Sequence, residues 1–352
     1  VQSLSASAQI EVVQEVTDIL DLTGGNLAGT VGQALAGPVR VQLTNSSGDG
    51  VAGAPVFFEV LSGGGSASPP QAQTGADGTA TTNWTLGPVA GVQELRVRVT
   101  PPGLQGSAAN AGANDIALIL TAQAAAAAPV TVRVEPADQT LAAGATANLT
   151  GEVVDEFGNP GPDQASYLLA WSSSDPDVAA ISPDGVVQAL TVGSAELTAT
   201  VQGNGSLQGS GTVTVIPGPA RSIAIVSGDN QSAPAGDPLP APLVVQVRDG
   251  FENPVPGIPV SWAITSGDAS VGQATTDTDG EGQAGVTVTL GDNAGLVEVT
   301  ASAEGAGSVL FRASAEGSLA ILTDSPLPMA AVGVPYSVTL TAAGGDGTYQ
   351  WS

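Results

Sequence analysis

The chain contains an internal repeat, and this repeat limits the possible folds more than any other feature of the sequence. Residues 24–91 match residues 228–295 without a gap, at a constant offset of 228 − 24 = 204. Identical residues recur along the whole span: Gly24/Gly228, Leu35/Leu239, Pro38/Pro242, Gly53/Gly257, Pro55/Pro259, Gly78/Gly282 and Thr85-Leu86-Gly87/Thr289-Leu290-Gly291. A register held over this length predicts two copies of one folded unit in a modular array.

Each copy is organised around a turn that leads into a strand. Residues 253–262 read NPVPGIPVSW in the second copy, and residues 49–58 read DGVAGAPVFF in the first. Asn, Asp and Gly tolerate the backbone angles of tight turns, and Pro presets φ. Residues 95–99 read LRVRV, and this alternation is typical of a strand with one buried and one solvated face. Both copies are therefore predicted to be built from strands.

A different unit lies between the two copies, at residues 130–216. It contains about seven short alternating segments with turn signals about every 8–12 residues, the pattern of an immunoglobulin-like sandwich. Short segments rich in Ala and Pro, at 124–129 and 217–219, separate it from the copies. No apolar stripe with helical spacing is sustained along the chain. We therefore predict an all-β protein made of tandem immunoglobulin-like β-sandwich domains in a linear array.

The predicted boundaries define three whole domains and two partial ones. The whole domains are residues 15–123, 130–216 and 220–317. Residues 1–14 alternate like the last strand of a truncated domain, and residues 318–352 like the truncated start of a further domain.

The charged and reactive residues exclude several classes of function. The chain has no Cys and no His, which excludes disulfides and removes the commonest general base. Its net charge is −26, and all seven basic residues are Arg. Because nucleic acids and anionic membranes are bound by clusters of basic residues, neither partner is expected. The apolar run at 116–130 is too short to span a bilayer, so no membrane insertion is expected. Without a nucleophile–base pair that uses His or Cys, or a phosphate loop, the chain is predicted not to be an enzyme.

One loop of the second copy is a candidate calcium site. Asp277, Asp279 and Glu281 alternate around Gly280, and Ca²⁺ prefers clustered carboxylate oxygens. The turn at 278–284 matches residues 74–80 of the first copy, which read TGADGTA and keep only Asp77, so this turn forms without the three carboxylates. The loop is interpreted as a structural turn, with calcium as the alternative and no other cofactor expected.

Two further sets of side chains could carry chemistry. Asp175 and Asp177 are close in sequence, but they lie in a polar corner of the middle unit and are interpreted as turn residues. The four Trp residues could form a sugar-stacking set. Each of them stands within a strand pattern, so they are interpreted as core residues: Trp84, Trp171, Trp262 and Trp351.

The repeated units share a specific set of turn and strand residues. In the second copy these are Gly236, Leu239, Pro242, Asn253-Pro254-Val255, Gly257, Pro259-Val260, the turn at 278–284 and Thr289-Leu290-Gly291. With these residues the units at 15–123 and 220–317 resemble the group 1 bacterial immunoglobulin-like domain, which is repeated in invasin- and intimin-like adhesins.

The remaining segments carry two other patterns. Residues 130–216 contain Pro136, Gly144, the stretch 155–159, Trp171-Ser172-Ser173-Ser174-Asp175-Pro176, Val178-Ala179, Gly185 and Gly193. This unit resembles the group 2 bacterial immunoglobulin-like domain, and residues 1–14 are similar to its last strand. Residues 324–352, with Leu327-Pro328, Pro335-Tyr336 and Trp351-Ser352, resemble another immunoglobulin-like repeat of bacterial surface proteins.

The resemblance implies a function at the cell surface or outside the cell. It predicts a non-catalytic spacer or stalk segment of an adhesin-like protein that presents a distal binding domain. A host receptor, a glycan or a neighbouring surface protein would then bind domains outside this segment, which is expected to be a monomeric rod. The alternative is an accessory segment of a large extracellular enzyme, either carbohydrate-active or a protease.

Overall fold

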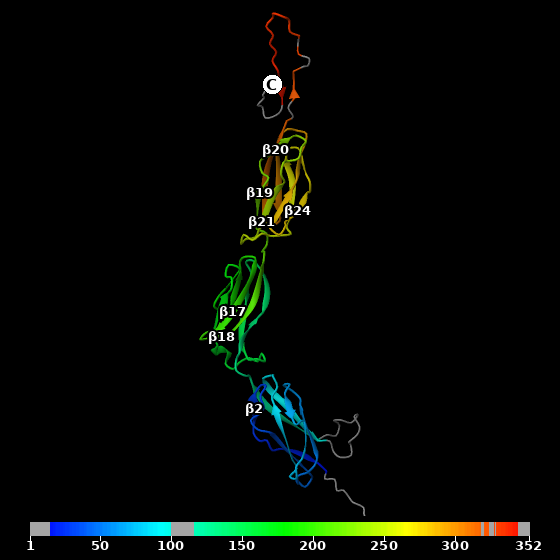
Figure 1. The fold of residues 1–352 in the computed structure, drawn as a ribbon, viewed down its shortest axis with the longest axis vertical. Helices are drawn as coiled ribbons and strands as arrows, with labels where there is room; N and C mark the ends of the chain where they lie inside the picture. Colours follow the sequence, from blue (N-terminus) through cyan, green and yellow to red (C-terminus); the bar gives the residue numbers. More distant parts are fainter. Residues whose placement is uncertain (1–14, 100–115, 318–319, 324–326, 328, 344–352) are drawn as a thin grey trace, which may run out of the picture. The chain divides into compact units, whose positions relative to one another are not determined.

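The computed structural model describes residues 15–99, 116–317, 320–323, 327 and 329–343. The sole helix in these residues is a three-residue 3₁₀ helix, Gln164–Ser166, and the regular structure is otherwise strand (Figure 1). The predicted all-β class is therefore confirmed. In the described part of the chain, no helix has the length and apolar character needed to cross a membrane. The predicted strand at 1–14 and the core position of Trp351 lie outside the described residues.

The chain divides into two compact units. One consists of Val1–Val134, Gly151–Ala170 and Ala199–Ser210, and the other of Glu135–Thr150, Trp171–Thr198 and Gly211–Ser352. The first sandwich lies in one unit and the third in the other, while residues 130–216 contribute to both.

The first sandwich buries its core between two sheets. Its strands are β1 (Asp18–Asp21), β2 (Leu27–Thr30), β3 (Val39–Thr44), β4 (Pro55–Val60), β5 (Ser66–Ser68), β6 (Gln71–Gln73), β7 (Thr79–Thr85), β8 (Gly91–Val99) and β9 (Ile116–Ala125). One sheet has the order β1-β3-β7-β5 and the other β2-β9-β8-β4-β6. Trp84 and Val41 from the first sheet join Val56, Val97 and Leu120 from the second in one buried cluster. The last strand continues two residues beyond the predicted boundary at 123.

Residues 131–216 form smaller sheets. Their strands are β10 (Thr131–Glu135), β11 (Asp138–Ala142), β12 (Thr146–Asn148), β13 (Thr150–Val154), β14 (Leu169–Ser173), β15 (Ala179–Ile181), β16 (Val186–Ala189), β17 (Gly193–Val201) and β18 (Asn204–Ile216). The sheet orders are β10-β13, β11-β18-β17-β14 and β12-β16-β15. These nine strands stand where about seven were predicted for an immunoglobulin-like unit.

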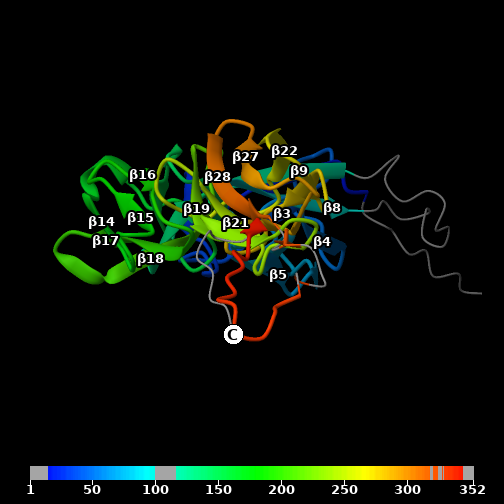
Figure 2. The ribbon, with the colours of Figure 1, turned by 90° about the horizontal axis from the view of Figure 1, so that it is seen from above.

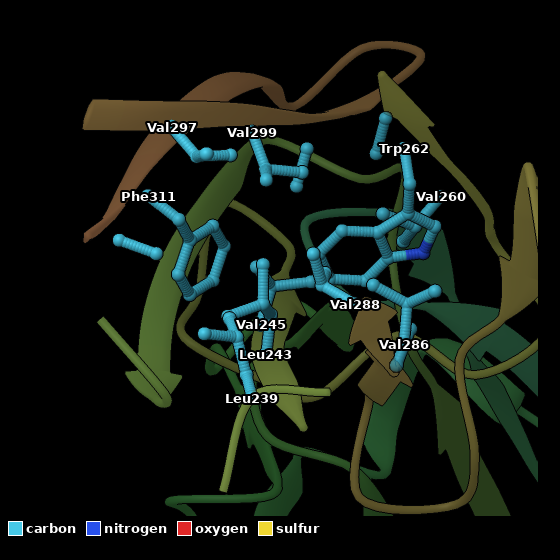
Figure 3. Close-up of a cluster of buried hydrophobic side chains, with 14 of the residues drawn as sticks. Leu239, Leu243, Val245, Val260, Trp262, Val286, Val288, Val297, Val299 and Phe311 are labelled. Carbon is cyan, nitrogen blue, oxygen red and sulfur yellow. The ribbon is translucent and has the colours of Figure 1, made fainter. Parts of the chain in front are cut away.

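The third sandwich repeats the first. Its strands are β19 (Ser222–Ser227), β20 (Gln231–Pro234), β21 (Leu243–Arg248), β22 (Pro259–Ser266), β23 (Ala269–Val271), β24 (Thr275–Asp277), β25 (Gln283–Val286), β26 (Val288–Leu290), β27 (Gly295–Ala303) and β28 (Gly307–Glu316). Figure 2 shows β28, β27 and β22 beside one another, in the sheet β20-β28-β27-β22-β24. Figure 3 shows the core, where Trp262 and Val299 of this sheet face Val245, Val286 and Val288. The rings of Trp262 and Phe311 lie 6.0 Å apart between centroids.

The two copies keep the same strand register. Val39 pairs with Thr82 in the first copy, and Leu243 pairs with Val286 in the third sandwich, at the same offset of 204. β8 and β27 cover equivalent residues, 91–99 and 295–303. This confirms the gapless correspondence inferred from sequence. A parallel pair closes each domain: β2 with β9, β11 with β18, and β20 with β28.

The last segment differs from its prediction. Residues 336–340 alternate in sequence, but they do not form a strand, and the described pairing is β29 (Ala320–Ile321) with β30 (Ala342–Ala343). Alternation alone does not make a strand, because each strand also needs a neighbour that accepts and donates its backbone hydrogen bonds.

Candidate functional site

The predicted calcium loop is a compact turn in the structure. Asp279 Oδ1 accepts hydrogen bonds from the backbone N–H groups of Glu281 (3.0 Å) and Gln283 (2.9 Å). Asp77 Oδ1 accepts a comparable bond from the N–H of Thr79 (3.0 Å) in the first copy. Asp277, Asp279 and Glu281 are exposed, and no three acidic side chains of the described residues are grouped as they would be around a metal ion. At the offset of 204, Asp77 matches Glu281 and Asp279 matches Gly75, so a carboxylate at a different position serves the turn in each copy. The loop stays interpreted as a structural turn, with calcium as the untested alternative.

The other candidate side chains have structural roles. Asp175 Oδ1 accepts hydrogen bonds from the N–H groups of Asp177 (3.1 Å) and Val178 (3.3 Å), so it stabilises the corner that contains it. Trp84 and Trp262 are buried in the cores of their sandwiches, as interpreted from the sequence. Trp171 is only half-buried, which differs from the full core position expected for it.

Two loops that the sequence indicated only as turns form the most distinctive polar sites. Asp249 is buried, and its Oδ1 accepts hydrogen bonds from the N–H groups of Phe251 (2.8 Å) and Asn253 (2.9 Å). Its Oδ2 accepts bonds from Asn253 Nδ2 (3.0 Å) and from the N–H of Gly218 in the preceding linker (2.8 Å). One carboxylate therefore holds its own loop and the connecting chain together.

Asp155 has the same set of partners in the middle domain. Its Oδ1 accepts hydrogen bonds from the N–H groups of Phe157 (2.9 Å) and Asn159 (2.8 Å). Its Oδ2 accepts bonds from Asn159 Nδ2 (2.9 Å) and from the N–H of Ala127 in the linker (2.9 Å). The linker residue thus has the same role before the middle domain and before the third sandwich.

The Asn at the end of each loop reaches the domain before it. Asn159 donates to the Pro88 carbonyl (2.8 Å), and its Oδ1 accepts from the N–H of Ala90 (2.9 Å). A primary amide can make both bonds because it carries a donor and an acceptor on one planar group.

Asn253 makes the equivalent pair of bonds. It donates to the Leu190 carbonyl (3.0 Å), and its Oδ1 accepts from the N–H of Val192 (3.0 Å). Both bonds join residues that lie more than 60 positions apart in the chain.

An aromatic ring completes each contact. The ring of Phe157 lies 3.0 Å from the position that a Cβ would occupy on Gly32, and the ring of Phe251 lies 2.6 Å from that position on Gly144. Both glycines have positive φ, so a side chain here would be strained as well as crowded. We name the Asp, Phe and Asn of each loop a junction clamp: Asp155/Phe157/Asn159 and Asp249/Phe251/Asn253.

The electrostatics favour a charged carboxylate in each clamp. Burial raises the pKa of Asp155 and Asp249, but the hydrogen bonds from Asn159 or Asn253, from the linker and from the loop backbone outweigh it, so the pKa of each lies below its usual value. Four donor groups bind the two oxygens of each carboxylate. The clamp can therefore hold its buried charge with protein donors alone.

Sequence reasoning missed these residues as a site, although a signal was present. Residues 155–160 read DEFGNP and residues 249–254 read DGFENP, in two units that otherwise follow different patterns. The matching stretch of the first sandwich has Asn45 and Asp49 in exchanged positions, with Ser47 in place of Phe. One hexapeptide pattern shared by two different units indicates a role common to both, beyond making a turn.

The fold and these junctions define a class of protein, in which immunoglobulin-like β-sandwiches follow one another through short, hydrogen-bonded linkers. Residues 128–213 match the model of the bacterial Ig-like domain (group 2), and residues 224–315 match that of the bacterial Ig-like domain (group 1). The chain therefore belongs to the proteins built from tandem bacterial immunoglobulin-like domains.

Several solved structures are similar to this chain. The Escherichia coli adhesin FdeC is 20% identical, with 88% of this chain and 99% of that chain covered and a TM-score of 0.47. Invasin, a bacterial integrin-binding protein, is 18% identical, with 86% of this chain and 60% of that chain covered and a TM-score of 0.40. The human desmocollin-1 ectodomain is 11% identical, with 86% and 59% covered and a TM-score of 0.46. A search of curated protein sequences found no match.

Proposed function

We propose that this chain is a non-catalytic spacer segment of an adhesin-like protein at the bacterial surface or outside the cell, and that the junction clamps limit bending between its domains. The observation that carries this proposal is the same clamp before the middle domain and before the third sandwich. A linker whose N–H is bound by a buried carboxylate is restrained, unlike a Gly/Ser tether.

The cost of opening a clamp supports a stiffening role. Bending would separate the Asn amide from the carbonyl and the N–H of the preceding domain. It would also expose the Asp carboxylate to water and break its hydrogen bond with the linker N–H. Each of these hydrogen bonds that is exchanged for one to water costs a net ~0.5–1.5 kcal/mol. A few such bonds at one junction favour the closed arrangement over bent alternatives.

The charge and the domain family support a surface location and a passive role. A net charge of −26 repels neighbouring copies over the screening length of ~8 Å at physiological ionic strength. The buried acids of the clamps are fully hydrogen-bonded, and Asp175 stabilises a turn, so these carboxylates are not poised for acid–base chemistry. A host receptor, glycan or surface protein would bind a domain outside this segment.

The test is a comparison of inter-domain flexibility by solution scattering and NMR relaxation. The parent chain should behave as an elongated monomer with few inter-domain orientations. The double variant Asn159→Ala/Asn253→Ala should sample more of them, while Asp49→Ala, at the matching exposed position of the first sandwich, should not. Equal flexibility in the parent and the double variant would contradict the proposal, as would saturable binding of the isolated segment to host cells or glycans.

A further inference from the structure

The half of the clamp that receives the Asn amide occurs a third time. In the first sandwich it consists of the Pro88 carbonyl, the Ala90 N–H and Gly32. In the middle domain it consists of the Leu190 carbonyl, the Val192 N–H and Gly144. At the offset of 204, the third sandwich has the Asp292 carbonyl, the Ala294 N–H and Gly236 at the positions of the first set. We name each of these three sets a socket.

Backbone hydrogen bonds show that the three sockets are equivalent. The Gly144 N–H donates to the Ala189 carbonyl (2.9 Å), and the Gly236 N–H donates to the Gly291 carbonyl (2.9 Å). The Gly32 N–H donates to the equivalent Gly87 carbonyl (3.2 Å) and also to the Leu86 carbonyl (3.1 Å). In each domain the socket carbonyl lies one residue after this equivalent acceptor, and the socket N–H lies three residues after it. The glycine of each socket has positive φ.

The third socket is held in shape by its own domain. In the first sandwich, Gln93 braces the loop through the Gly87 N–H (2.8 Å) and the Val89 carbonyl (2.7 Å). The third sandwich has no Gln at the matching position. Instead, the Gly291 N–H donates to the backbone oxygen of Asp268 (2.7 Å), and Asn293 Nδ2 donates to Asp268 Oδ2 (2.7 Å). Different side chains thus maintain one loop shape.

Within the described residues, the third socket is open. Asp292 and Ala294 are exposed, and neither the Asp292 carbonyl nor the Ala294 N–H forms a hydrogen bond there. Among the described residues, no ring covers Gly236, and the atom nearest to its Cβ position is Asp292 Oδ1 at 3.6 Å. The same groups in the two other sockets are occupied by Asn and Phe.

The chemistry of the socket selects its occupant. A carbonyl beside an N–H requires one group that both donates and accepts, which a primary amide does and a carboxylate or an ammonium group does not. The first sandwich's own loop presents Asp49 at the Asn position, so it supplies acceptors only. The open glycine leaves room for an aromatic ring two residues before the amide, as in both clamps.

We propose that the end of the third sandwich that carries the third socket is a docking site for a further immunoglobulin-like module whose loop reads Asp-x-Phe-x-Asn. This inference rests on the proposed function, because it extends the same clamp to another junction. The socket contributes backbone groups, so its recognition depends little on the side chains of its own loop.

The first test places the third socket's sequence where an occupant is known. Pro88→Asp/Val89→Asn converts the first sandwich's loop from Gly-Pro-Val-Ala to the Gly-Asp-Asn-Ala of residues 291–294, using two exposed positions. Hydrogen exchange of the Ala90 amide should stay slow in the full chain. Adding Asn159→Ala should speed it about tenfold, which corresponds to ~1.4 kcal/mol. If Pro88→Asp/Val89→Asn alone makes hydrogen exchange of the Ala90 amide fast, the Gly-Asp-Asn-Ala sequence does not form a working socket. That result would overturn the proposal.

The second test supplies the third socket with an occupant. Ala125 is the last residue of β9 and pairs with Thr30, and Glu316 is the last residue of β28 and pairs with the equivalent Pro234. A second copy of residues 126–216 is therefore joined directly after Glu316. The Ala294 amide should then exchange about tenfold more slowly than in the parent, and Asn159→Ala in the added copy should abolish this protection. Unchanged exchange at Ala294, with a folded added copy, would overturn the docking site. In that case slow exchange at Ala90 and Val192 would leave the proposed function intact, and fast exchange at both would overturn it too.

Discussion

Asn253 donates its side-chain amide to the carboxylate of Asp249 at 3.0 Å, and its backbone N–H donates to the other oxygen of the same carboxylate at 2.9 Å. The buried charge of Asp249 therefore fixes the loop, and it orients the Asn253 amide independently of the contacts with the preceding domain. Because the amide is already oriented, less conformational freedom is lost when it binds the Leu190 carbonyl.

Removal of this amide should weaken the junction. Asn253→Ala leaves the Leu190 carbonyl and the Val192 N–H without their partner and takes one donor from Asp249. We expect the free energy of unfolding to fall by ~1–3 kcal/mol, measured by denaturant titration. Asp49→Ala, at the equivalent exposed position of the first sandwich, is the control and should change it by less than ~0.5 kcal/mol. Similar losses in both variants would show that the Asn253 contacts do not stabilise the protein.

The junctions should lose stability in acid. The folded pKa of Asp249 lies below its ordinary value of 3.8, because the donated hydrogen bonds outweigh the opposing effect of burial. The ionised carboxylate thus contributes fully above the ordinary pKa, and this contribution is lost as pH falls through the lower folded pKa. Unfolding titrations from pH 7 downwards should show a decline beginning near pH 4, and Asp249→Asn should reduce the slope of that decline. An unchanged slope in the variant would argue against this role.

In β18 of the middle domain, an added methyl group should destabilise the protein at Gly209 but not at Gly205. A Cβ on Gly209 would lie 1.7 Å from the Val132 backbone oxygen, whereas a Cβ on Gly205 of the same strand meets nothing within 4 Å. We expect Gly209→Ala to destabilise the protein by ~1–3 kcal/mol or more, and Gly205→Ala to change stability by less than ~0.5 kcal/mol. Thermal melts of the two variants test this contrast, and equal melting temperatures would contradict it.

Calcium should leave the stability unchanged. Asp279 uses its carboxylate for the turn, and the described residues contain no group of three acids around a common point. Melts with calcium and with a chelator should therefore coincide. A shift of several degrees that disappears in Asp277→Asn/Asp279→Asn would instead establish the loop as a calcium site. A shift that survives both substitutions would place the ion elsewhere.

The sequence by itself determined the class, the repeat and the register. Alternation of apolar residues fixes which face of a strand is buried, and Gly, Pro, Asn and Asp mark the turns between strands. The offset of 204 then carried the pairing of Val39 with Thr82 onto Leu243 with Val286. The sequence could not show that residues 336–340 lack a strand partner among the described residues, because strand pairing depends on a second segment.

Only the tertiary structure decided what the Asp-x-Phe-x-Asn loops do. Their local chemistry is that of an ordinary turn, because Asp249 would bind the N–H groups of Phe251 and Asn253 with or without another domain nearby. The groups that meet Asn253 are a carbonyl and an N–H of residues 190 and 192, more than 60 positions away. Every residue except proline has both groups, so no side chain in the sequence marks this socket, and its place follows only from the fold of the domain.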